Sequence, residues 1–511
     1  MEPAKLDVRS PMFEDIMTEG EGGVPDFRTY LAGEWVAGRR WVEVRSPIDL
    51  STIARVPRLG WGDVGPALAK VYEVGRWRVR DMPGERRLEV LRRAADLMEE
   101  AAGDFINALM INAGKTRAAA EGEVRACVER LRIAAMDARK LLGDYVPGDW
   151  SSRTLESEGF VRREPYGVVL AIIPFNYPLF DTVNKFTYSV VAGNAVVVKP
   201  PSADPIPSIL FARVVEAAGF PREGLAVATM PGREAGRLVS DPRVGVVSLT
   251  GSTETGVKVL RQAGVKQFIM ELGGGDPAIV LDDADPEAAA EELVKGVTSY
   301  SGQRCDAIKL ILAEAGIYER LKAEILRRVR GVRVGDPRRD DVDAGPLIGP
   351  EAVEEMLKAV EEAVKAGCTL LYGGRRLGPT YVEPAILEAP SKEVLKNLTL
   401  YRGEVFAPVA VMLRVKGVDE AVELANGRRY GLDAAVFGRD INKIRKLVRH
   451  LEVGAIYINE SPKHGIGYYP FGGRKDSGIG REGIGYSIEY VTAYKTIVYN
   501  YRGKGVWNYY L

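Results

Sequence analysis

Apolar residues recur at helical spacing along much of the first 150 residues of this 511-residue chain. In two stretches, residues 85–114 and 123–143, apolar side chains appear every three or four positions with charged residues between them, and each stretch ends at a glycine. This periodicity is typical of amphipathic helices. We therefore expect a largely helical N-terminal region.

After about residue 165 the pattern changes to short, β-branched apolar runs bounded by Gly or Pro. Such runs alternate with helix-length segments, as buried strands and helices do in a doubly wound parallel sheet. In the first series we expect one helix over 178–193 and strands within 166–174, 194–201, 225–232, 244–252 and 266–285, the last stretch holding two strands.

A second αβ series follows from about residue 286 to 470. Helices are expected near 287–299 and 316–330, and strands within 311–316, 406–415, 434–438 and 454–460. The aromatic C-terminal stretch 495–511 is also strand-like, and a lone strand needs a pairing partner in this chain or another subunit. The fold class is therefore α/β.

The composition narrows the possible partners. Lys and Arg total 70, as do Asp and Glu, so the net charge is zero and favours neither nucleic acid nor an anionic membrane. No apolar run approaches the roughly 20 residues that a membrane helix needs. The first 17 residues are acidic where a signal peptide is basic, so we expect a cytoplasmic protein. Few Gln and Cys residues together with many Arg and Glu residues are typical of thermophilic proteins.

Three cysteines and two histidines limit the chemistry of the chain. So few cysteines do not build a disulfide scaffold, and no pair has the spacing of zinc ligands. Cys127 and Cys368 fit the pattern of small buried residues. Cys305 follows a Gly-Gln-Arg turn, so it is expected to open a helix or a loop. A helix N-terminus and the neighbouring Arg304 would both lower the thiol pKa. Cys305 is therefore a candidate nucleophile.

The shortage of histidine favours a carboxylate as general base. Glu271 ends an apolar run and precedes three glycines, and burial raises a carboxyl pKa toward the range that a base needs. His464, in a loop, stays open as an alternative. A surface acid at a strand end remains the ordinary interpretation of Glu271 alone.

Four candidate residues end predicted strands: Asn176, Lys199, Gly251 and Glu271. Ligands of open α/β sheets bind outside the carboxyl ends of the strands. Asn176 can donate to a developing oxyanion, and the small residues from Gly251 onward open a helix that favours an anion. Each residue alone can be an ordinary turn residue, but the coincidence of four favours a functional site.

Seven sequence blocks resemble the aldehyde dehydrogenase superfamily, in its order and spacing, over about residues 27–500. They are PFNYP (174–178), VVVKPP (196–201), LTGSTETG (249–256), ELGGGDPAIV (271–280), GQRC (302–305), GEVFAPV (403–409) and YYPFGGRKDSGIGREG (468–483). The resemblance implies that Cys305 attacks an aldehyde, with Asn176 and the Cys305 N–H as oxyanion hole. A hydride then passes to the nicotinamide, and Glu271 activates the water that hydrolyses the resulting thioester.

The same resemblance implies that NADP or NAD is the cofactor. Lys199 and Glu404 would hold ribose hydroxyls, Gly251 and Ser252 the pyrophosphate, and Phe406 the nicotinamide ribose. Family members strict for NAD often carry an acid where this chain has Ser202, so we expect NADP to be accepted.

The resemblance also implies three structural parts. These are a Rossmann-type dinucleotide-binding domain (1–146 and 167–272), an α/β catalytic domain (273–470) and a small oligomerisation sheet (147–166 and 485–511). A homotetramer or homodimer is expected, because these are the family's usual assemblies.

Within the superfamily, the chain is most like the non-phosphorylating glyceraldehyde-3-phosphate dehydrogenases, particularly archaeal ones. That likeness implies a glycolytic step, with Arg304, Tyr177, His464 and Arg125 binding the substrate, although bacterial members carry arginine where His464 stands. Arg304 can also simply pair with Asp306. The alternatives are a succinate-semialdehyde or other aldehyde dehydrogenase, or a catalytically silent binding protein on the same fold.

Overall fold

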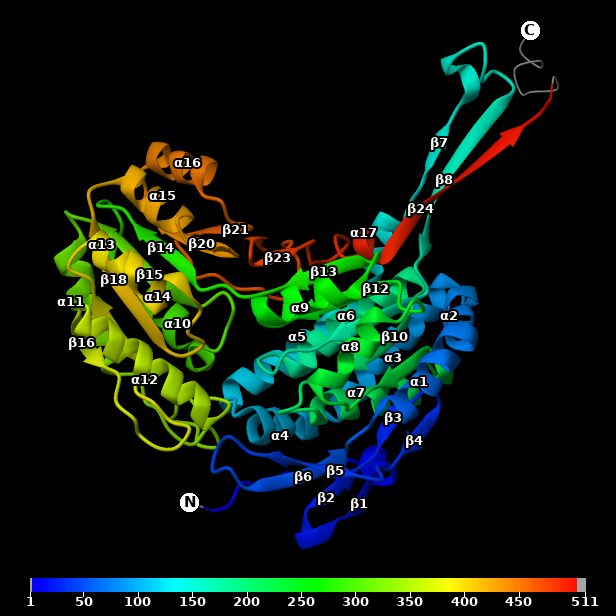
Figure 1. Cartoon of the computed structure of the whole chain (residues 1–511), viewed down its shortest axis with the longest axis horizontal. Coiled ribbons are helices and arrows are strands. Elements are labelled where there is room, and N and C mark those ends of the chain that lie inside the picture. Colours follow the sequence, from blue (N-terminus) through cyan, green and yellow to red (C-terminus); the bar gives the residue numbers. More distant parts are fainter. Residues whose placement is uncertain (1, 503–511) are drawn as a thin grey trace.

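A computed structural model describes residues 2–502 as two open α/β sheets with a narrow arm that projects from the body (Figure 1). From edge to edge the eight-stranded sheet contains β23 (Gly478–Ile479), β13 (Gln267–Glu271), β12 (Val246–Thr250), β9 (Val168–Ile172), β10 (Ala195–Lys199), β11 (Leu225–Val227), β3 (Thr29–Leu31) and β4 (Glu34–Val36). The five strands from β13 to β11 are parallel. The expected α/β class is confirmed.

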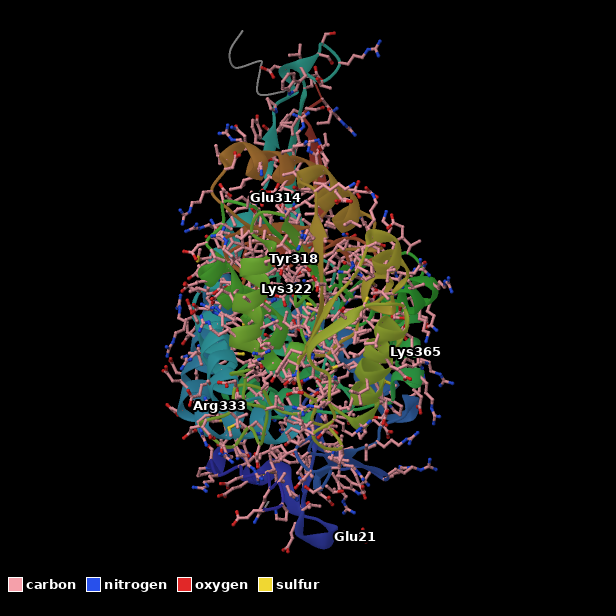
Figure 2. The ribbon with its side chains drawn as sticks, turned by 90° about the vertical axis from the view of Figure 1, so that its left-hand side faces the viewer. Glu21, Glu314, Tyr318, Lys322, Arg333 and Lys365 are labelled. Atoms are coloured by element: carbon pink, nitrogen blue, oxygen red, sulfur yellow. The ribbon has the colours of Figure 1, made fainter. Side chains whose placement is uncertain are left out.

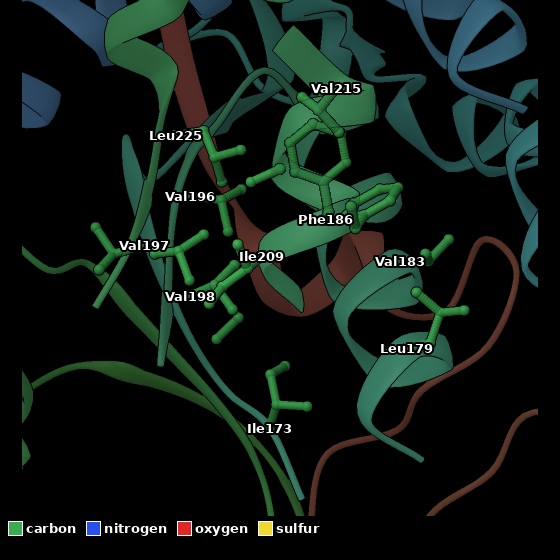
Figure 3. Close-up of a cluster of buried hydrophobic side chains, with 14 of the residues drawn as sticks. Ile173, Leu179, Val183, Phe186, Val196, Val197, Val198, Ile209, Val215 and Leu225 are labelled. Atoms are coloured by element: carbon green, nitrogen blue, oxygen red, sulfur yellow. The ribbon is translucent and has the colours of Figure 1, made fainter. Parts of the chain in front are cut away.

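Helices cover both faces of this sheet. They include α3 (Gly84–Glu100), α4 (Ala102–Ala113), α5 (Arg117–Arg132), α6 (Pro178–Ala192), α7 (Ile206–Ala217), α8 (Gly232–Ser240) and α9 (Thr253–Ala263). Figure 3 shows Phe186 of α6 among apolar side chains of β10 and α7. Its ring meets Phe211 and Phe220 edge-on, with centroids 5.5 and 5.1 Å away. Burial of these side chains fixes the helices against the sheet.

The seven-stranded sheet contains β16 (Thr369–Gly373), β17 (Ala385–Glu388), β18 (Val409–Val415), β15 (Ile308–Glu314), β14 (Asp276–Val280), β20 (Asp433–Phe437) and β21 (Ala455–Ile458). Its helices include α10 (Pro286–Thr298), α11 (Tyr318–Val329), α12 (Pro350–Lys365), α14 (Thr399–Arg402) and α16 (Ile441–His450). Partly buried ion pairs tie two of these helices to the strands: Lys322 of α11 bonds to Glu388, and Lys443 of α16 bonds to Glu314. Figure 2 shows Glu314, Tyr318 and Lys322 following one another down the molecule.

The arm consists of β7 (Asp144–Val146), β8 (Ser157–Pro165) and β24 (Thr492–Asn500). β24 pairs with β8 in antiparallel register along its whole length, so the predicted C-terminal strand finds its partner within the same chain. Residues 503–511 of that prediction lie outside the described residues. Several large apolar side chains of the arm are exposed: Tyr145, Val146, Trp150, Leu155, Phe160, Tyr494, Val498 and Tyr499.

The N-terminal region differs from the expected helical pattern. The first 60 residues form short strands, among them β1 (Met17–Glu19), β2 (Pro25–Phe27), β5 (Trp41–Arg45) and β6 (Thr52–Pro57), which make a separate four-stranded sheet. Strands of three to six residues are too short to show a period of two in the sequence. No helix among residues 2–502 is long and apolar enough to span a membrane.

Two predicted helix boundaries were also wrong. The helix expected over 85–114 is broken at Ala101 (φ −95°, ψ 17°), because side-chain periodicity continues across a single irregular residue. The next helix begins earlier than expected, where the Thr116 hydroxyl accepts the Ala119 N–H, and tightens into a 3₁₀ helix over 134–141. The α12 helix was not predicted.

Candidate active site

Four parallel strands deliver candidate residues to one edge of the eight-stranded sheet. Thr250 of β12 pairs with Glu271 of β13, and Lys199 of β10 pairs with Ile172 of β9. Asn176 lies four residues beyond Ile172, just before α6. It is buried, and its amide makes no hydrogen bond to another described residue. The strand ends therefore converge where an α/β sheet holds its ligands.

Three glycines after Glu271 carry the chain from one sheet to the other. The N–H of Gly274 donates to Glu404 Oε1 (3.0 Å), and the N–H of Gly275 donates to the carbonyl oxygen of Cys305 (2.9 Å). A Cβ on Gly274 would lie 2.1 Å from that carbonyl, and one on Gly273 would lie 2.6 Å from Glu404 Oε2. Only glycine fits the approach to backbone at Gly274, whereas a side chain at Gly273 would push the Glu404 carboxylate aside. This crossing therefore fixes Glu271, Cys305 and Glu404 relative to one another.

The loop before Cys305 has an unusual backbone. Tyr300 (φ 47°), Ser301 (φ 54°) and Gly302 (φ 67°) follow one another in the left-handed region, which costs about 1–3 kcal/mol for each non-glycine residue. The Tyr300 hydroxyl donates to the Ala113 carbonyl (2.7 Å) at the end of α4. Long-range contacts thus impose this conformation, as is common where a loop presents a reactive side chain.

Lys309 clamps this loop to the segment that carries Glu404. Its buried ammonium donates to the Gly302 carbonyl (3.0 Å) and to the carbonyl of Ala407. Burial lowers its pKa to about 7 despite the nearby Glu404. The sequence offered a signal for this residue, since it is a lone lysine at the start of an apolar strand.

Cys305 lies in a turn, so of the two expected settings, the start of a helix or a loop, the structure has the loop. Its thiol pKa is raised well above the usual value by burial, with Asp306 and Glu404 adding to the effect. The expected lowering by Arg304 is absent because that guanidinium is neutralised by Asp306. The resting thiol is therefore protonated and needs a base.

Glu271 is 2% exposed, and neither carboxylate oxygen has a hydrogen-bond partner among residues 2–502. Burial raises its pKa well above the usual value, and Glu482 raises it further. The direction agrees with the expectation from sequence. A carboxyl in this state accepts and releases protons closer to neutral pH.

Behind Glu271 lies a buried polar cluster that the sequence did not reveal. Lys185 forms an ion pair with Glu482, which also accepts from Asn184 Nδ2 (3.1 Å) and from the Tyr188 hydroxyl (3.3 Å). Three of these residues come from α6, whose side chains are otherwise mostly apolar. The one signal in the sequence was Lys185, a single lysine within an otherwise largely apolar helix. Its partner, Glu482, lies 297 positions away, so the sequence does not show the pair.

The proposed substrate residues fall into two groups. Arg304 is 7% exposed; its Nε donates to Asp306 (3.0 Å) and its Nη2 to the Pro462 carbonyl (2.6 Å), whereas Nη1 bonds to no described residue. Tyr177 lies beside it, and its ring packs on the Lys115 ammonium at 3.9 Å.

The two remaining residues do not join that pair. The His464 imidazole packs between Phe180 and Phe471, with Nε2 4.0 Å from Glu482, so it faces the buried cluster. Arg125 points from α5 with 74% of its side chain exposed, and its nearest acid is Glu121 at 3.9 Å. The assignment of both to substrate stays a prediction.

The expected cofactor residues fit a nucleotide. Lys199 Nζ lies 3.4 Å from Ser202 Oγ and has no carboxylate within 4 Å in the described part of the chain. Ser252 caps α9 by accepting the Thr255 N–H, which leaves the first turn of that helix open to an anion. Phe406 packs edge-on against Phe175. These donors suit ribose hydroxyls and a pyrophosphate.

Comparisons with known proteins all match this chain to aldehyde dehydrogenases. The model of the aldehyde dehydrogenase family matches residues 35–497. Lactaldehyde dehydrogenase of Methanocaldococcus jannaschii is 33% identical over 92% of this chain and 99% of its own. NADP-dependent glyceraldehyde-3-phosphate dehydrogenase of Streptococcus equinus is 32% identical over 93% and 98%. The solved NADP complex of the Bacillus halodurans NADP-dependent glyceraldehyde-3-phosphate dehydrogenase superposes with a TM-score of 0.88 at 33% identity, covering 93% and 99%.

The charge on Lys199 predicts a pH dependence of cofactor binding. Burial lowers its pKa to about 8, so the cationic form, which is the stronger donor to a ribose hydroxyl, is present below pH 8 and is lost above it. The dissociation constant for NADP, measured by calorimetric titration, should therefore rise between pH 7 and 9. The Lys199→Arg variant stays charged and should lack this step; a flat wild-type profile contradicts the assignment.

Proposed function

Because the chain belongs to the aldehyde dehydrogenase family, we propose that it oxidises an aldehyde to a free carboxylic acid through a thioester on Cys305. The observation that carries the proposal is the glycine crossing, which joins the Glu271 strand to the Cys305 backbone through the Gly275 N–H. Nucleophile and base are thereby held at one site.

The chemistry follows from these side chains. The Cys305 thiol gives its proton to water as its sulfur bonds to the aldehyde carbon, and the oxyanion that forms accepts from the Asn176 amide and the Cys305 N–H. The oxyanion becomes a thioester when its carbon gives up a hydride. When bound, NAD(P) supplies the hydride acceptor. Glu271 then takes a proton from water, the hydroxide adds to the thioester, and the C–S bond breaks to release the acid and the thiol.

Replacing Glu271 by Gln should separate the two halves of the reaction. The amide keeps the shape of the side chain but accepts no proton, so hydrolysis slows by about 100-fold or more while the first hydride transfer persists. Rapid mixing should show a burst of reduced cofactor of one per active site. Cys305→Ser should show no burst, and an unchanged steady-state rate in Glu271→Gln would refute this role.

For the substrate we propose glyceraldehyde 3-phosphate, oxidised to 3-phosphoglycerate without inorganic phosphate. Support comes from Arg304, whose Nε and Nη2 are fixed while Nη1 stays available as a charged donor beside Tyr177 and Cys305. An unphosphorylated hydroxyaldehyde such as lactaldehyde is the second candidate. It is favoured by His464, which faces Glu482 instead of offering the cation that a phosphate would seek.

The two candidates differ by one phosphate, so glyceraldehyde with and without it is the matched pair of substrates. The phosphorylated aldehyde should have a kcat/KM about 10- to 100-fold higher, the worth of a charged hydrogen bond. Arg304→Gln should remove most of the difference in kcat/KM between the two aldehydes, and Arg304→Lys should keep part of it. The same comparison in Arg125→Gln shows whether the exposed Arg125 also contributes to binding the phosphate. Equal kcat/KM for both aldehydes in the wild type would favour the lactaldehyde-like alternative.

We also propose that the arm joins copies of the chain into a homodimer or homotetramer. Its exposed apolar side chains, including Phe160, Val498 and Tyr499, cover both faces of a thin sheet that has no other layer against it (Figure 1). An apolar surface of this kind is typical of a subunit interface.

Val498→Asp should therefore weaken assembly, because it buries a charge in that interface. Light scattering after size separation should show a smaller mass or a higher dissociation concentration than for the wild type. Val265→Asp alters an exposed valine outside the arm and is the control. A monomeric wild type would refute the proposal.

A further inference from the structure

The end of α4 contacts three segments of the candidate site within four residues, 112–115. Asn112 Nδ2 donates to the Ala203 carbonyl (3.0 Å), in the loop after β10. The Ala113 carbonyl accepts the Tyr300 hydroxyl from the loop that precedes the candidate nucleophile. Lys115 reaches the third segment, which joins β9 to α6. One short stretch of chain thus touches the cofactor loop, the nucleophile loop and the expected oxyanion hole.

The Lys115 ammonium lies between two aromatic rings. The residue is 1% exposed and forms an ion pair with Glu123 (2.5 Å). Its Nζ is 3.9 Å from the centre of the Tyr177 ring and 4.4 Å from the centre of the Tyr300 ring. The two ring centres are 6.5 Å apart. A cation attracts the faces of both rings, most strongly where water is excluded, so the ammonium draws the rings together.

Glu123 holds the backbone of the same segment. The residue is buried, and its Oε1 accepts the N–H groups of Leu179 (3.1 Å) and Phe180 (2.9 Å). A carboxylate is favoured there by the dipole of α6. Because α6 begins directly after Asn176 and Tyr177, Glu123 fixes this stretch of backbone while its ion-pair partner fixes the ring.

The two rings differ in what else holds them. Tyr300 is anchored by its own hydroxyl, and Lys309 donates to the neighbouring Gly302 carbonyl. The Tyr177 side chain has no hydrogen bond to another described residue, so its specific contacts are those with Lys115 and the Tyr300 ring. Loss of the cation would therefore release Tyr177 and leave the nucleophile loop in place.

We propose that Lys115 is a positioning residue that holds the Tyr177 ring against Tyr300. The Asn176 amide, one position before Tyr177, is thereby kept at its working distance from the Cys305 sulfur. Donors to an oxyanion act only at hydrogen-bond distance, so a small displacement of this amide slows the reaction. The inference rests on the proposed function, because the oxyanion hole belongs to that reaction.

The test is the first turnover of the full chain carrying Lys115→Met and Glu123→Gln together, after rapid mixing with NADP and either glyceraldehyde 3-phosphate or glyceraldehyde. The double change leaves no unpaired buried ion, and the amide oxygen still accepts the N–H groups of α6. The burst rate at saturating aldehyde should fall about 10- to 100-fold with both aldehydes. The dissociation constant for NADP should change less than about twofold, because its own contacts are unaltered.

Two further measurements separate positioning from a general structural role. Alkylation of Cys305 by iodoacetamide needs no oxyanion hole, so in the double variant its rate should change less than about twofold. Lys115→Arg keeps a cation that stacks on aromatic rings and should retain at least about a third of the wild-type burst rate.

The matched control is Lys322→Met with Glu388→Gln. Lys322 bonds to Glu388 and lies 5.4 Å from the centre of the Tyr318 ring, at the other sheet, so this variant should keep the wild-type burst rate.

Four results would overturn the inference: an unchanged burst in the double Lys115 variant, an equal fall in its alkylation rate, a loss confined to the phosphorylated aldehyde, or a Lys115→Arg variant as slow as the double one. A wild type that gives no burst with either aldehyde would refute the proposed function itself.

Discussion

The rest of the site depends on the close passage of backbone at Gly273–Gly275. At this point the chain leaves one sheet and enters the other, with the carbonyl of Cys305 and the carboxylate of Glu404 packed against it. Any side chain at Gly274 would overlap the Cys305 carbonyl, and the backbone or the nucleophile would have to move. Since misplacement by 1 Å costs catalysis heavily, the missing Cβ at Gly274 is what lets Cys305 and Glu271 share one site with the geometry that the proposed reaction needs.

Burial gives this geometry its electrostatic character. The pKa values of Glu271 and Cys305 are raised by burial, and those of Lys199 and Lys309 are lowered by it. All four groups are therefore held nearer to neutrality than they would be in water. For Glu271 the raised pKa moves toward neutral pH, as a general base needs, whereas the raised pKa of the Cys305 thiol moves away from it.

The sequence predicted features that are local in the chain and failed on those that depend on distant partners. Short apolar runs with a polar residue at the end located Lys199 and Glu271, because strand burial and strand termination are both local. Lys185 and Glu482 were not found, since their pairing spans 297 positions. The expected direction of the thiol pKa was wrong because burial of Cys305, which depends on distant parts of the chain, outweighs Arg304, and Arg304 forms the ion pair with Asp306 that the sequence offered as its alternative.

The arginines around the site differ in how far the fold has already fixed them. Arg304 is held by Asp306 and Pro462, so a ligand meets a guanidinium whose entropy is already lost and whose charge is partly compensated. Arg125, by contrast, has 74% of its side chain exposed and only Glu121 at 3.9 Å, so binding would have to order it. A buried, pre-positioned donor favours discrimination by geometry, whereas an exposed cation acts through a field that salt screens over roughly 10 Å. Of the two candidate substrate arginines, Arg304 is thus suited to orienting a ligand and Arg125 to attracting one.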